Sequence, residues 1–226
     1  MAELLDERAE SEAVTDGGVP EEEAFDDEDE LEDDEASAAS ARCAELLAKA
    51  EEIKAAGNEL FKAKQYKKAI VKFSKVRAYT WLPTGEAAQY GQGVAASRNY
   101  SAAEVSAITR LDFIACGNVA QCYVGLGEYR KALDFCAKVV GPPGGNAAEQ
   151  DARAPHADLH VKALARSALC ALELSDLDVS KALVGRALAL DATCAPARAV
   201  YKRLQAAYKD HREAQKKQMA AAFASA

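Results

Sequence analysis

The sequence predicts an all-α protein in which pairs of helices repeat along the chain. The composition is 50% hydrophobic and only 7% aromatic, with many alanines, which are strong helix formers. From about Ala41 onward, apolar residues recur at the three- and four-residue spacing of helices. Small residues also return at the same offsets in three separate segments, which indicates a helical repeat. The length of 226 residues suits one domain of ordinary size and a tail.

The first expected element is an acidic tail over residues 1–40. It contains 18 Asp or Glu residues and one Arg, for a local net charge of -17. Residues 41–226 hold 18 acidic and 27 basic residues, so the total charge of -8 conceals a body of +9. Because bulky apolar residues are sparse in its most acidic stretch, we expect the tail to be disordered. It would serve as a solubility tail, as a phosphorylatable tail, or as an intramolecular competitor that folds back over the basic body.

Three helix pairs are expected after this tail, and each has small residues where its two helices cross. These are Gly57 with Ala69, Ala120 with Ala132, and Ala168 with Ser180. Anchored on these offsets, each pair fits a unit of 34 residues. The predicted repeats span about residues 50–83, 113–146 and 161–194, within a domain over residues 41–220.

Two insertions separate the predicted repeats. The first, residues 84–112, contains a capping-box pattern at Ser101 with Glu104, so the next helix should begin directly after Ser101 and be unusually long. The second, residues 147–160, continues a run of proline and glycine and is expected to be a loop until shortly after Pro155. Insertions of this kind are tolerated because each repeat packs only on its neighbours.

A final helix is expected over about residues 195–220, with Pro196 in its first turn. Val200, Leu204 and Tyr208 share one side of it, which would cover the apolar face of the last repeat. Its basic end, KDHREAQKKQM, would also suit calmodulin or an anionic surface, but the capping role already explains a charged helix.

The unit length and the recurring small residues resemble the tetratricopeptide repeat (TPR), over roughly residues 45–218. The resemblance implies a superhelix of three helix-turn-helix repeats followed by a C-terminal capping helix. In such a solenoid the first helix of every repeat lines a concave groove, which can hold an extended peptide.

The expected groove helices carry three cations and two amides. Lys54 and Asn58 lie four residues apart in the first repeat, as Lys162 and Arg166 do in the third, and Asn118 comes from the second. Lysine supplies point charge, arginine supplies directed donors, and asparagine both donates and accepts. Together they could bind the closely spaced carboxylates at the end of an acidic peptide.

These five positions resemble the dicarboxylate clamp of TPR co-chaperones. The resemblance implies binding of the C-terminal Glu-Glu-Val-Asp tail of heat-shock protein 90 or heat-shock protein 70. Phe61, next to the clamp, would form the apolar pocket for the peptide or would pack between helices. The long first insertion and the basic end with Met219 and Phe223 resemble the FKBP-type and cyclophilin-type immunophilins. No strand-rich segment precedes Ala41, so isomerase activity is not expected.

Other functions find little support in the sequence. There is no P-loop, G-x-S-x-G or H-E-x-x-H motif, so no enzyme, cofactor or small-molecule substrate is expected. The basic residues lack stacking aromatics, which argues against nucleic acid. We expect no membrane span, no signal peptide and a cytoplasmic location. The remaining alternative is a general scaffold that binds proteins through other faces, with the clamp residues merely solvated.

The cysteines are expected to be reduced packing residues. They show no C-x-x-C spacing, and the histidines do not cluster with them, so neither zinc nor a disulfide framework is predicted. They are Cys43, Cys116, Cys122, Cys136, Cys170 and Cys194.

Overall fold

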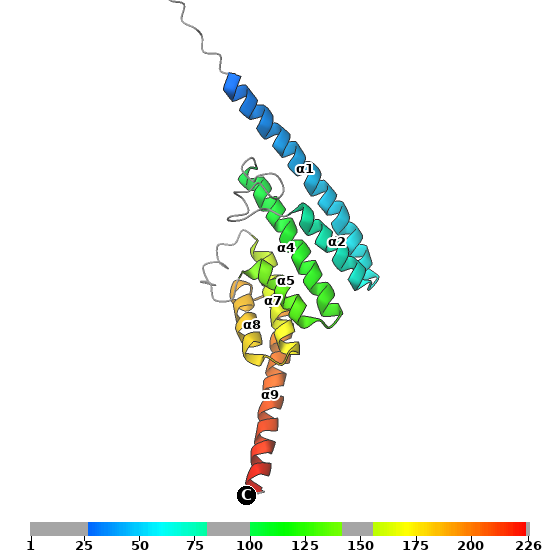
Figure 1. Cartoon of the computed structure of the whole chain (residues 1–226). Coiled ribbons are helices and arrows are strands. Elements are labelled where there is room, and N and C mark those ends of the chain that lie inside the picture. Colours follow the sequence, from blue (N-terminus) through cyan, green and yellow to red (C-terminus); the bar gives the residue numbers. More distant parts are fainter. Residues whose placement is uncertain (1–26, 81–99, 142–155, 225–226) are drawn as a thin grey trace, which may run out of the picture.

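The computed structural model describes residues 27–80, 100–141 and 156–224, and every regular element in these ranges is a helix (Figure 1). The all-α prediction is therefore confirmed. The helices are α1 (Asp27–Lys62), α2 (Tyr66–Tyr79), α4 (Ala102–Gly125), α5 (Tyr129–Val140), α7 (Ala157–Glu173), α8 (Leu177–Leu190) and α9 (Ala195–Ala224).

The helices pack as three consecutive pairs and a cap. α1 pairs with α2, α4 with α5, and α7 with α8, while α2 contacts α4 and α5 contacts α7 between neighbouring pairs. The first helices of the pairs also touch in order, α1 on α4 and α4 on α7. α9 packs against α7 and α8 and closes the stack (Figure 1). This is the predicted arrangement of three helix-turn-helix repeats and a C-terminal capping helix.

The turns inside the three pairs have the same backbone structure. Lys64, Gly127 and Ser175 have φ angles of 56°, 74° and 64°, in the left-handed region. In each turn the next backbone N–H donates to the carbonyl five residues earlier at 2.9 Å, which is the longer bond of a Schellman motif. The three turns lie at the same offset from residues 50, 113 and 161, so one local structure recurs in all pairs.

Small residues let the two helices of each pair approach closely, as predicted. A Cβ built on Gly57 would lie 2.7 Å from Cε1 of Phe73, whose side chain is 1% exposed. In the third pair Ser180 is fully buried, and its hydroxyl donates to the carbonyl of Ala168 at 2.8 Å. A larger side chain at these positions would force the helices apart.

Two predicted helix starts are confirmed. The side chain of Ser101 accepts from the backbone N–H of Glu104, and Glu104 accepts from the backbone N–H of Ser101, so α4 begins with a complete capping box. That contact with the Ser101 N–H lowers the pKa of Glu104. α7 begins at Ala157, shortly after Pro155 as expected. The proline and glycine residues that precede it lie outside the described residues.

The disorder predicted for residues 1–40 is wrong for its last part, because α1 already begins at Asp27. Asp and Glu are favoured near a helix amino terminus, and the run ASAASARCA, from Ala36, supplies helix-forming alanines before the first repeat. Net charge alone therefore gave the wrong boundary between the acidic tail and the first helix. Residues 1–26 lie outside the described residues. The prediction that the acidic tail folds back over the basic body therefore stays a prediction for these residues.

α9 caps the third pair with its first half only. Ala197, Val200 and Leu204 are at most 5% exposed and pack on the core between α7 and α8, as the sequence predicts. Beyond Tyr208 the helix is exposed and extends away from the body to Ala224 (Figure 1). None of the helices within the described ranges is long and apolar enough to cross a membrane.

All six cysteines are buried free thiols, which confirms their role as packing residues. Burial raises the pKa of Cys170 to about 12, and burial together with the nearby Asp112 carboxylate raises that of Cys116 to about 12. These thiols therefore stay protonated at neutral pH and are poor nucleophiles.

Candidate functional site

The first helices of the three pairs carry the five predicted clamp residues. α1 provides Lys54 and Asn58, α4 provides Asn118, and α7 provides Lys162 and Arg166. Because α1 contacts α4 and α4 contacts α7, these three helices form one continuous layer. The five residues thus come from neighbouring helices although they span more than a hundred residues of sequence.

The two amides meet between α1 and α4. The side-chain amide of Asn118 donates to the carbonyl oxygen of Asn58 at 3.4 Å, and both residues are half-buried. Lys54 lies one helical turn before Asn58, with its side chain 19% exposed and its ammonium paired with Glu51. The structure therefore connects the α1 and α4 contributions directly.

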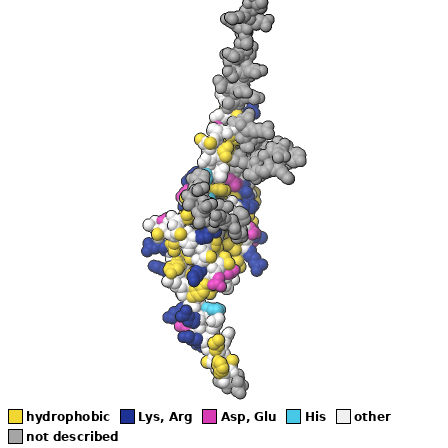
Figure 2. All heavy atoms as spheres, turned by 90° about the vertical axis from the view of Figure 1, so that its left-hand side faces the viewer, with side chains coloured by type: hydrophobic (Ala, Val, Ile, Leu, Met, Phe, Trp, Pro, Cys, Tyr) yellow, Lys and Arg dark blue, Asp and Glu magenta, His cyan; other side chains and the backbone are white. Residues whose placement is uncertain are grey.

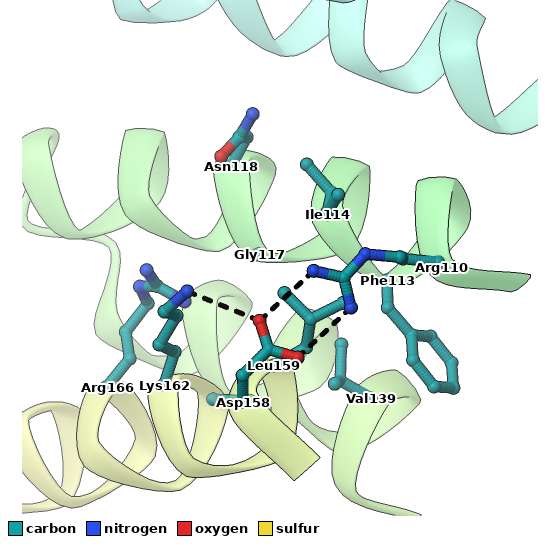
Figure 3. A pocket seen from close by; sticks show the side chains of 11 residues that line it. Arg110, Phe113, Ile114, Gly117, Asn118, Val139, Asp158, Leu159, Lys162 and Arg166 are labelled. Carbon is teal, nitrogen blue, oxygen red and sulfur yellow. Dashed lines mark hydrogen bonds and ion pairs between the residues drawn. The ribbon is translucent and has the colours of Figure 1, made fainter. Parts of the chain in front are cut away.

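The cations of α7 face α4 across a pocket of about 300 Å³ (Figure 3). Asn118, Lys162 and Arg166 all line it. The guanidinium lies against the α4 backbone at Gly117, where an added Cβ would be in ordinary van der Waals contact, 3.5 Å from Nη1 of Arg166. The guanidinium Nε of Arg166 donates to Oε1 of Gln121 at 2.9 Å, which fixes the side chain beside α4.

Sequence reasoning missed two charged residues of this pocket, Arg110 and Asp158. Arg110 donates to both carboxylate oxygens of Asp158, at 3.1 and 3.3 Å, and Lys162 lies 3.5 Å from one of them (Figure 3). The hydrogen bond from Arg110 lowers the pKa of the Asp158 carboxyl. Helical spacing could have revealed both residues, since Arg110 lies two turns before Asn118 and Asp158 one turn before Lys162.

Phe61 packs between helices. Its ring lies 5.5 Å from the ring of Tyr66 in a tilted arrangement, and it packs against a buried cluster from α2 and α4. The packing role left open by the sequence is therefore present. Its contact with a bound peptide stays a prediction.

In the described structure each predicted cation already has an acceptor. Lys54 pairs with Glu51, Lys162 with Asp158 and Arg166 with Gln121. Each of these cations is thus held by a nearby side chain. The side chain of Lys162 is nevertheless 61% exposed, so a ligand can reach it. An arriving carboxylate would exchange with these local acceptors and gain charge-assisted hydrogen bonds from several donors at once.

Figure 2 shows Lys and Arg side chains on two parts of the surface, the body and the projecting part of α9. They are interspersed with uncharged surface. A dispersed positive surface attracts anions over long range without specifying a ligand. The pocket between α4 and α7 is therefore the stronger candidate.

Comparison with known proteins supports the fold. The structure is similar to the C-terminal TPR-containing domain of a Plasmodium falciparum protein described as an FK506-binding protein, with a TM-score of 0.53 and 21% sequence identity. The similarity covers 76% of this chain and 95% of that domain. No protein-family model matches the sequence, and no curated protein matches it significantly. The chain therefore has a TPR fold.

Proposed function

We propose that this protein is a TPR adaptor that binds the C-terminal Glu-Glu-Val-Asp tail of heat-shock protein 90 or heat-shock protein 70 and catalyses no reaction. The observation that supports the proposal is that α1, α4 and α7 contact one another in order and together carry three cations and two amides. They are Lys54, Asn58, Asn118, Lys162 and Arg166.

The chemistry of the tail suits these residues. A C-terminal aspartate presents its main-chain and side-chain carboxylates close together, and Lys162 and Arg166 extend into one pocket from consecutive turns of α7. The amides of Asn58 and Asn118 already contact each other at 3.4 Å and could exchange that weak bond for the peptide backbone. In the proposed complex, charge provides affinity and the amides orient the chain.

Isothermal titration with a peptide ending in Glu-Glu-Val-Asp tests the proposal. We expect a micromolar dissociation constant that weakens as salt is raised. The same peptide with an amidated C-terminus loses one of the two terminal carboxylates and should bind at least about tenfold more weakly. Equal affinities for both peptides, or no binding at about 1 mM, would contradict the proposal.

A second candidate function is a scaffold that uses the projecting part of α9. Met219 and Phe223 are 66% and 82% exposed there, and apolar side chains on a basic helix commonly meet a partner protein. Replacing both by serine should then abolish partner capture, whereas alanine at Lys162 and Arg166 should leave it intact. The clamp proposal predicts the opposite pattern for a chaperone tail.

A further inference from the structure

The contact between Arg110 and Asp158 shows that the pocket between α4 and α7 can bind a carboxylate beside the predicted clamp. Arg110 belongs to α4 and Asp158 to the first turn of α7, and two parallel N–H···O bonds of 3.1 and 3.3 Å join them. This two-pronged geometry gives arginine its strongest selectivity for a carboxylate. Lys162 adds a third donor at 3.5 Å.

This arrangement shares a cation with the clamp. Lys162 both belongs to the proposed clamp and pairs with Asp158, and all three charged residues line the same pocket as Asn118 and Arg166 (Figure 3). While Asp158 holds Lys162, an incoming carboxylate competes with it for the same ammonium. The local carboxylate therefore affects the affinity of the whole pocket.

The contact is poorly suited to a purely structural role. Arg110 and Asp158 are each 46% exposed, and exposed ion pairs contribute little to stability. The interface of α4 and α7 already has an apolar core that includes Cys116 and Leu164, both fully buried. Exposure also means that a ligand can reach the arginine from the pocket.

We propose that Arg110 and Lys162 form a second carboxylate site, which Asp158 occupies in the free protein and which an acidic side chain of the bound tail occupies in the complex. This inference rests on the proposed function. A tail ending in Glu-Glu-Val-Asp offers two glutamates just upstream of the residue assigned to the clamp, and either would supply the required carboxylate. Asp158 then acts as an internal competitor that favours acidic tails over neutral ones.

The test is a set of titrations of the full chain with two peptides. One ends in Glu-Glu-Val-Asp, and in the other both glutamates are glutamine. Arg110→Gln should weaken binding of the glutamate peptide by about threefold to tenfold and leave the glutamine peptide unchanged. Asp158→Asn should tighten binding of the glutamate peptide by a similar factor, more at low salt than at high salt.

Glu128→Gln is the matched control. It also removes one carboxylate from an exposed pair, with Lys131, but at the turn between α4 and α5 and outside the pocket. We expect it to bind both peptides as the parent does. Thermal unfolding of every variant checks the fold, and Asp158→Ser replaces Asp158→Asn if the latter is unfolded, because serine is also favoured near a helix start.

The outcomes separate this inference from the proposed function. If the parent binds neither peptide, both the second carboxylate site and the proposed function are refuted. If the parent binds but Arg110→Gln weakens both peptides equally or neither, the second site is refuted while the clamp stands. If Asp158→Asn behaves like Glu128→Gln, the role of Asp158 as a competitor is likewise refuted.

Discussion

The faces between paired helices differ from the face formed by α1, α4 and α7 in how far their residues repeat from one helix pair to the next. Between paired helices, equivalent positions in the three repeats are equally small and equally buried, as Ala69, Ala132 and Ser180 show with 0% exposure each. On the groove face each repeat differs, since α1 offers a lysine and an amide, α4 an amide and Arg110, and α7 three charged residues. Repetition specifies the fold, whereas the residues of the proposed site are those that differ between the repeats.

The largest expected effect comes from breaking the repeated packing. Phe73 is 1% exposed and fills the space left open by Gly57, so Phe73→Ala should lower the free energy of unfolding by about 3 to 5 kcal/mol. Chemical denaturation measures this loss. A decrease below about 1 kcal/mol would show that the contact between Gly57 and Phe73 is not tightly packed.

A smaller effect is expected when the same substitution is made at two helical glycines. Gly57→Ala places a Cβ 2.7 Å from the Phe73 ring and should destabilise by about 1 to 2 kcal/mol even after its gain in helix propensity. Gly185→Ala in α8 meets nothing within 4 Å and should stabilise by about 0.5 to 1 kcal/mol. Thermal or chemical unfolding measures both changes in stability. If both substitutions stabilise the protein, or both destabilise it, the packing described for the first pair is contradicted.

The smallest expected effect is a change in the pKa of one side chain, the carboxyl group of Asp158. The pKa of Asp158 is lowered in the folded chain, so its pairing is present above its ordinary pKa and is lost as pH falls through the lowered value. Arg110→Gln should raise this pKa toward the ordinary range in an NMR titration of the side-chain carboxyl. Asp191, whose pKa is lowered by Thr193, should not respond and serves as the internal control.

Much of the fold is predictable because its signals are local. The start of α4 follows from the Ser101 and Glu104 pattern, and the pairing of helices follows from small residues at fixed offsets. The start of α1 at Asp27 was missed because a high acidic content outweighed the helix-forming alanines that follow it.

The groove was only partly predictable. Lys54 with Asn58 and Lys162 with Arg166 can be recognised within single helices, because each pair lies four residues apart. The contact between Arg110 and Asp158 joins residues 48 positions apart and depends on how α4 and α7 align. Helical spacing could have pointed to each residue, but no local pattern specifies the alignment, so their contact required the structure.

The most direct test of the central claim compares two variants that each lose two cations. Lys162→Ala with Arg166→Ala removes the α7 part of the clamp, and Lys67→Ala with Lys68→Ala removes two exposed lysines from α2. With the Glu-Glu-Val-Asp peptide, we expect the first variant to bind at least about 30-fold more weakly than the parent and the second within about threefold of it. Equal binding by the parent and both variants would contradict the account.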